Sequence, residues 1–133
     1  MPNAGNSFDV SLENAHLDWG SYRSPTNRAV ISGEAYIAIP KAYAVSFGIF
    51  NSNNPKTGLG YNEFIASSKD GFLKDVILLA QGCSSAGDPY AKQFSVKGNL
   101  KMLGDWFTHC GATTNNRVKV TFTSSTSLIL EVI

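Results

Sequence analysis

The dipeptide Asp70-Gly71 constrains the fold of this chain more than any other feature of its sequence. It separates two β-like runs, residues 61–67 and 72–81. Asp-Gly between such runs is a strong short-range signal for a β-hairpin. Within the second run, residues 76–80 are apolar throughout, which predicts a central strand of the sheet. We therefore expect the fold to be organised around an antiparallel hairpin.

Other short elements surround this hairpin. Extended runs are expected at residues 8–12, 34–39 and 90–96, and a closing hairpin at 118–122 and 127–132. Pro40 suits the first turn of a short helix that ends near Phe47. Asn99 suits the cap of a second helix, which presents Leu103 and Phe107 inward and ends at Gly111. Residues 20–28 and 51–58 have no periodicity and are expected to be exposed loops.

The pattern thus predicts a mostly β fold with two short helices, arranged as a small, mostly antiparallel barrel or partly open barrel. The chain has 133 residues and 43% hydrophobic residues, which suits one core and a single domain over residues 1–133. We find no apolar run of about 18 residues and no basic leader followed by an apolar stretch, so we expect a cytoplasmic protein. In that setting the two cysteines, Cys83 and Cys110, are expected to be reduced thiols.

The charges are unevenly distributed, although the formal net charge is only +1. Residues 19–33 contain two arginines and no acid, and residues 90–101 contain three lysines and no acid. The overall balance gives no support to non-specific polyanion binding, so any nucleic-acid function must depend on these two segments.

Motifs for catalysis are missing from the sequence. No phosphate-binding loop and no Gly-x-Ser-x-Gly elbow is present. None of the glutamates has a lysine two positions later, as the metal-dependent nuclease motif would require. His109 and Cys110 are adjacent on a predicted helix and therefore point in different directions, which favours a surface histidine and a core cysteine. We expect a non-enzymatic domain without a metal or a cofactor.

A series of short motifs resembles the B3-like DNA-recognition domains of certain restriction endonucleases. The series begins with Leu-Asp-Trp-Gly-Ser-Tyr-Arg at residues 17–23 and Gly-Glu-Ala-Tyr-Ile-Ala-Ile-Pro at 33–40. It continues with Asp-Gly at 70–71, Ala-Gln-Gly at 80–82, Lys92, Asn99, Leu-Gly at 103–104 and the aromatic pair Trp106 and Phe107. These markers span nearly the whole chain in the family's order.

The resemblance implies an open seven-stranded pseudobarrel of the B3 type, with a short helix at each end and two arms that enter the major groove of double-stranded DNA. The first arm corresponds to residues 20–32 and the second to residues 81–97, which are the two acid-poor segments. It also implies a target-recognition domain of a restriction-modification system, partnered by a nuclease or NTPase domain or subunit. The domain itself is expected to be monomeric and to be a part of a larger protein.

Side-chain chemistry divides the candidate contacts into two groups. Bases in the major groove are read by side chains that offer paired donors or a donor with an acceptor. Phosphates are held by lysines, hydroxyls and backbone amides. The base-contact candidates are Arg23, Asn27, Arg28, Gln81, Asp88 and Gln93. The phosphate-contact candidates are Ser24, Thr26, Ser84, Ser85, Lys92, Lys97 and Lys101.

Three other functions compete with this hypothesis. The same arms would also suit a reader of methylated bases, either in place or flipped out of the stack. A small nuclease or hydrolase would use scattered residues such as Asp9, His16, Asp18 and His109. A protein-interaction barrel would have no nucleic-acid role.

Overall fold

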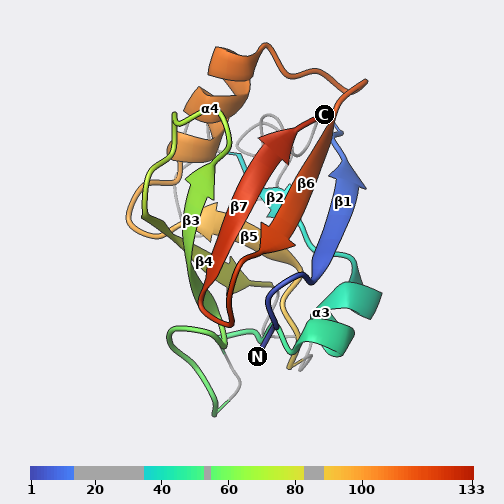
Figure 1. Ribbon diagram of the computed structural model, residues 1–133, viewed down its shortest axis with the longest axis vertical. Helices are drawn as coiled ribbons and strands as arrows, with labels where there is room; N and C mark the ends of the chain where they lie inside the picture. Colours follow the sequence, from blue (N-terminus) through green and yellow to red (C-terminus); the bar gives the residue numbers. More distant parts are fainter. Residues whose placement is uncertain (14–34, 53–54, 83–88) are drawn as a thin grey trace, which may run out of the picture.

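The computed structural model describes residues 1–13, 35–52, 55–82 and 89–133, and every structural statement below concerns these residues. They form one seven-stranded sheet in the order β1-β6-β7-β3-β4-β5-β2. The strands are β1 (Ser7–Ser11), β2 (Ile37–Ala38), β3 (Glu63–Ser68), β4 (Val76–Gln81), β5 (Gln93–Val96), β6 (Arg117–Phe122) and β7 (Ser127–Val132). The sheet curls until it is nearly a closed barrel, with an open seam between β1 and β2 (Figure 1). The predicted open, mostly β architecture is confirmed.

All neighbouring strands pair in antiparallel fashion except β3 and β7, which are parallel. The parallel pair aligns Ile65 with Ser127 and Ser68 with Leu130. It joins the central hairpin to the closing hairpin of β6 and β7, and both hairpins were predicted. Together the two hairpins form four adjacent strands of the sheet.

The turn between β3 and β4 is wider than the Asp-Gly signal predicts. Gly71 has a φ of +82° and Asp75 a φ of +49°, so the chain bends twice before β4 begins at Val76. Between the bends, Leu73 is buried in the core. The middle strand of the sheet is β3, and β4 lies beside it. Only alternate residues of β4, Leu78 and Ala80, are fully buried, so this apolar run is not covered on both faces.

Inward-facing side chains from all parts of the sheet form one core. Phe64 of β3 packs edge-on against Phe94 of β5, with ring centroids 6.0 Å apart, and against Phe122 of β6 at 5.4 Å. Alternation along β3 and β6 places Phe64 and Phe122 inside. In β5, three consecutive residues from Phe94 to Val96 are buried, including the polar Ser95.

A helix lies near each end of the barrel (Figure 1). Helix α3 (Lys41–Phe47) follows Pro40, and α4 (Met102–Cys110) follows the turn at Asn99. Gly48 and Gly111 end the two helices in the left-handed conformation, as glycine permits without a steric penalty. Leu103, Trp106 and Phe107 of α4 are buried, as the sequence predicts. No helix within the described residues is long and apolar enough to cross a membrane.

Two local predictions were wrong. Asn99 does not cap α4: the N-cap residue is Lys101, and Asn99 lies in the turn before it. Residues 51–58 were expected to be exposed throughout, yet Asn51 is completely buried. Its side chain and backbone bind groups that lie far away in the sequence, so its polarity does not signal exposure.

Candidate functional site

Three of the candidate DNA contacts line one hollow on the outer face of the sheet. Gln81, Gln93 and Lys97 surround this hollow of about 360 Å³, which we call the glutamine pocket. Its remaining walls come from β2, β4, β5 and their flanking turns: Ala35, Tyr36, Leu79, Ser95, Val96, Gly98 and Leu100. The sequence separates these residues by up to 65 positions, and the sheet brings them together.

Strand register explains why the two glutamines meet. Gln81 ends β4 and Gln93 begins β5, and the two residues are directly paired across the antiparallel ladder. Because Ala80 and Phe94 face the core, the adjacent glutamines face outward. The Gln81 Nε2 atom lies 3.5 Å from Ser95 Oγ, a long hydrogen bond. Among the described residues, the Gln93 side chain has no hydrogen-bond partner. The amide groups therefore retain capacity to bind a ligand.

Lys97 differs from the glutamines because it already has a partner. Its ammonium forms an ion pair with Glu63 of β3, while its backbone N–H donates to Ile77 O at 2.8 Å. The Lys97 side chain is 58% exposed and that of Glu63 is 21% exposed. A phosphate that bound Lys97 would have to compete with this carboxylate.

Lys92 and Lys101 are exposed on either side of the pocket. The Lys92 backbone N–H donates to Gln81 O at 3.0 Å, and its alkyl chain covers Gly82, where an added Cβ would lie 3.0 Å from Lys92 Cγ. Lys101 stands at the N-terminus of α4, where its backbone N–H donates to Asn99 Oδ1 at 3.2 Å. Neither ammonium makes an ion pair with the described residues.

The pocket includes much of the second predicted arm, residues 81–97, and lies between the end of the first arm and the flanks of residues 83–88. The chain re-enters the described region at Ala35, whose N–H donates to Leu100 O, near the Val96 end of β5. Gly82 and Pro89, which flank residues 83–88, lie near the Gln93 end of the same strand. Tyr36, next to Ala35, has its pKa raised by burial and by the negative charge of Glu13, at the other flank of residues 14–34.

The other predicted contacts lie outside the described residues. They are Arg23, Ser24, Thr26, Asn27, Arg28, Ser84, Ser85 and Asp88.

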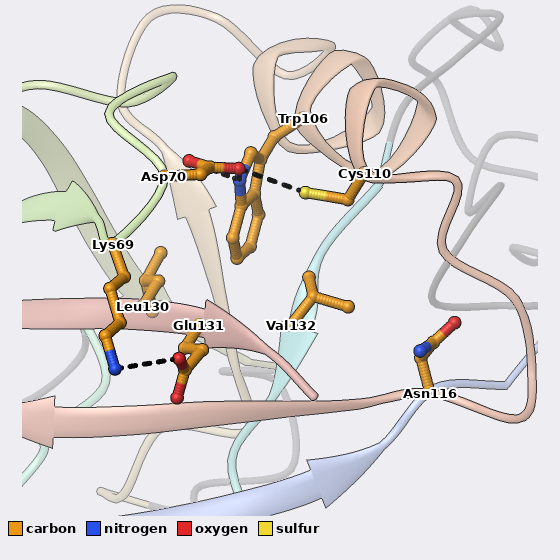
Figure 2. A pocket seen from close by; sticks show the side chains of 8 residues that line it. All are labelled: Lys69, Asp70, Trp106, Cys110, Asn116, Leu130, Glu131 and Val132. Atoms are coloured by element: carbon orange, nitrogen blue, oxygen red, sulfur yellow. Dashed lines mark hydrogen bonds and ion pairs between the residues drawn. The ribbon is translucent and has the colours of Figure 1, made fainter.

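A second hollow of about 450 Å³ lies between the C-terminal end of α4, the β3–β4 turn and the end of β7 (Figure 2). We call it the Asp70 pocket; its lining residues are Lys69, Asp70, Trp106, Cys110, Asn116, Leu130, Glu131 and Val132. Figure 2 shows Asp70 beside the indole of Trp106 and the thiol of Cys110, with the Lys69–Glu131 ion pair at 3.1 Å below them. Sequence reasoning gave no sign of this cluster.

The Asp70 carboxylate is saturated with donors. It accepts hydrogen bonds from the Ser68 hydroxyl, from the Phe72 N–H at 3.1 Å, from Trp106 Nε1 at 3.0 Å and from Cys110 Sγ at 3.2 Å. These bonds, led by that from Ser68, hold the pKa of Asp70 well below its ordinary value. The carboxylate thus fastens the β3–β4 turn to α4.

Cys110 is a free thiol that is poorly suited to nucleophilic chemistry. Burial, followed by the hydrogen bond and the charge of Asp70, raises its pKa to about 11. The thiolate is the reactive form of cysteine, so this thiol is held in its inert state at neutral pH. The neighbouring His109 points elsewhere, is exposed, and stacks on Phe72 with ring centroids 4.6 Å apart. Within the described part of the chain, no group of three or more His, Cys, Asp or Glu residues is arranged to hold a metal ion.

Comparison with known proteins adds no family to this description. No family model matches the chain, and neither a curated protein nor a solved structure is significantly similar to it. The resemblance to B3-like domains therefore remains a prediction from the sequence motifs, and the function must be argued from the residues themselves.

Proposed function

We propose that this domain binds double-stranded DNA in a sequence-specific manner, with the glutamine pocket facing the major groove. The observation that carries the proposal is the meeting of Gln81 and Gln93, side by side and facing outward, between the flanks of the two predicted arms. A glutamine amide offers one donor and one acceptor together, which matches the N6 and N7 positions of adenine in the major groove. The preferred duplex would then contain adenine opposite this pocket.

The charges around the pocket also support a polyanionic ligand. None of the residues that line it carries a carboxylate, but Lys97 on its wall is paired with Glu63 of β3, and the charge of Glu13 acts on Tyr36. Lys92 and Lys101 add two cations at the margins without acidic partners among the described residues. Contacts of this kind position a protein on phosphates without reading sequence.

The spacing of the arm flanks suits a groove. They lie near opposite ends of β5, a strand of four residues, whose first and last Cα atoms are roughly 10 Å apart at the usual rise per residue. The major groove of B-form DNA is about 12 Å wide. In the proposed complex residues 20–32, the first arm, and residues 83–88, within the second arm at 81–97, enter the groove on either side of the pocket, and Arg23 and Arg28 read guanine.

In this proposal the domain has no catalytic activity of its own and acts as the targeting domain of a restriction system, beside a nuclease or NTPase partner. This part of the proposal is supported by the sequence resemblance and by the absence of catalytic motifs.

Selection from a random duplex pool, followed by sequencing of the retained DNA, tests the proposal. We expect enrichment of a short motif that contains adenine, and loss of that enrichment when Gln81 and Gln93 are both replaced by alanine. Retention of no duplex at low salt would refute the proposal in favour of a protein-interaction barrel. If DNA were retained only when its bases were methylated, the domain would be a reader of methylated bases. Magnesium-dependent cleavage by the isolated chain would indicate a nuclease.

A further inference from the structure

Asn51 holds together the two chain segments that carry the candidate contacts. Its side-chain Oδ1 accepts the backbone N–H of Gly82 at 3.2 Å, and its own backbone N–H donates to Pro89 O at 2.8 Å. Gly82 follows Gln81, and Pro89 precedes β5 by a few residues. One buried residue thus binds both flanks of residues 83–88.

The segment around Asn51 reinforces this arrangement along its length. Ala91 N–H donates to Ile49 O at 3.1 Å, and Phe50 forms a β-bridge with Tyr90. The Phe50 ring stacks between Tyr90, at 5.7 Å, and Tyr61, at 6.3 Å. The chain that leaves α3 therefore runs beside the entry to β5 and is anchored to it by backbone and ring contacts.

The position of Gln81 follows from these contacts. Its carbonyl accepts the N–H of Lys92, and the next residue, Gly82, is bound by Asn51. A glutamine reads a base edge only when its backbone is held in place, because paired hydrogen bonds tolerate little displacement. Asn51 is completely buried, so it cannot itself reach a ligand.

We infer that Asn51 is a positioning residue for DNA recognition: by binding the N–H of Gly82 it fixes the backbone next to Gln81 and so controls which bases are preferred without touching them. The inference rests on the proposed function. It assigns a role in specificity to a residue that does not line the glutamine pocket.

Asn51→Leu provides the main test, because leucine has a similar size and cannot accept the Gly82 N–H. We expect the preference for the selected duplex over a random duplex to fall about tenfold, as expected for loss of one paired base contact. Affinity for the random duplex should stay nearly constant. In the absence of DNA, hydrogen exchange at the Gly82 amide should become about tenfold faster as its bond is lost.

Two other substitutions separate positioning from general stability. Asn51→Asp keeps an oxygen acceptor for Gly82 and should retain most of the preference. Asn62→Leu is the matched control, because Asn62 is also buried and its Oδ1 accepts the N–H of Gly58 at 2.6 Å, in a different turn. It should lower stability but leave the preference intact. If Asn51→Leu does not fold, Asn51→Ser, whose hydroxyl is too short to reach Gly82, replaces it in the same assay.

The outcomes separate failure of the proposed function from failure of the role assigned to Asn51. Wild-type protein that prefers no duplex refutes the proposed function, and the inference falls with it. A wild-type protein with a clear preference that Asn51→Leu retains, despite faster exchange at Gly82, overturns only the role of Asn51. Equal loss of preference in Asn62→Leu would show that general destabilisation, not positioning, is responsible.

Discussion

The two pockets of this domain contain similar polar groups but use them differently. In the Asp70 pocket, the carboxylate accepts hydrogen bonds from four residues, and Lys69 and Glu131 neutralise each other. In the glutamine pocket, Gln93 has no partner among the described residues and Gln81 has one long hydrogen bond. Polar groups satisfied within the protein stabilise the fold, whereas groups with unused capacity are available to a ligand. The comparison therefore assigns a structural role to the first pocket and supports the recognition role that we propose for the second.

The largest expected effect is on stability at the Asp70 pocket. Trp106 is 1% exposed, and Asp70→Ala removes the acceptor of its indole N–H. The substitution also releases the β3–β4 turn from α4. The Trp106 donor left without an acceptor should lower the free energy of unfolding by about 2 kcal/mol. The other bonds to Asp70 add little, because this carboxylate is exposed and solvent screens its charge. Urea denaturation measures this change in the free energy of unfolding. Asp105→Ala, which removes an exposed carboxylate from the first turn of α4, should cost about 0.5 kcal/mol; equal losses would contradict the structural role of Asp70.

Stability at low pH should depend on the same Asp70 carboxylate. Because folding lowers the pKa of Asp70 below its ordinary value of 3.8, its contribution to stability is fully present above that pH and is lost as the pH falls through the lower folded value. Wild-type protein should therefore lose stability below about pH 4 more steeply than Asp70→Asn. Urea midpoints between pH 6 and pH 2 test this, and parallel curves would show that the hydrogen bonds to Asp70 are not made in solution.

The reactivity of Cys110 is the next largest effect. A pKa raised from 9.0 to about 11 leaves about a hundredfold less thiolate at pH 8 than an ordinary cysteine has. Alkylation by iodoacetamide at Cys110, followed by peptide mass spectrometry, should be slower by about that factor in the folded protein than in urea. Rapid labelling of the native protein would show that the Asp70 pocket is open and less ordered than described.

Gln93→Ala should have the opposite pattern from Asp70→Ala. It removes an outward-facing side chain that has no hydrogen-bond partner in the described part of the chain, so the free energy of unfolding should change by less than about 0.5 kcal/mol. Binding to the selected duplex should weaken by about 1 to 3 kcal/mol. Thr121→Ala, on the outer face of β6, is the control that should change neither quantity. Destabilisation by Gln93→Ala without an effect on binding would reverse the assignment of the two pockets.

The smallest effect concerns the ion pair at the margin of the glutamine pocket. Glu63→Gln frees Lys97, and affinity for all duplexes should rise about two- to threefold, since one more cation becomes available to phosphate. Lys97→Ala should weaken all duplexes alike. Affinities measured over a range of salt concentrations decide this, and a sequence-dependent response would mean that Lys97 contacts a base.

Local sequence signals were sufficient for most elements of the fold. Asp-Gly at 70–71 predicted the pairing of β3 with β4, Pro40 marked the start of α3, and Gly111 marked the end of α4. The parallel contact of β3 with β7 was not predictable in this way, because it joins residues about sixty positions apart and neither strand carries a signal for its partner. The late start of β4 was also missed, because no local sequence signal marks the left-handed conformation of Asp75 or the burial of Leu73.

The candidate site was predicted only in part. Sequence chemistry selected Gln81, Gln93 and Lys97, and the structure brings these three to one pocket. It gave no signal for Glu63 as the partner of Lys97 or for Asn51 as the anchor of Gly82, because both contacts cross more than thirty positions of sequence. A polar residue in a turn-rich segment looks exposed until its distant partners are known.

An NMR titration of isotope-labelled protein with the selected duplex tests the central claim most directly, because side-chain amide and indole signals report on the two pockets separately. The account predicts large shifts for the side-chain amides of Gln81 and Gln93 and an unchanged indole signal for Trp106. Shifts of Trp106 with unchanged glutamine amides would contradict it.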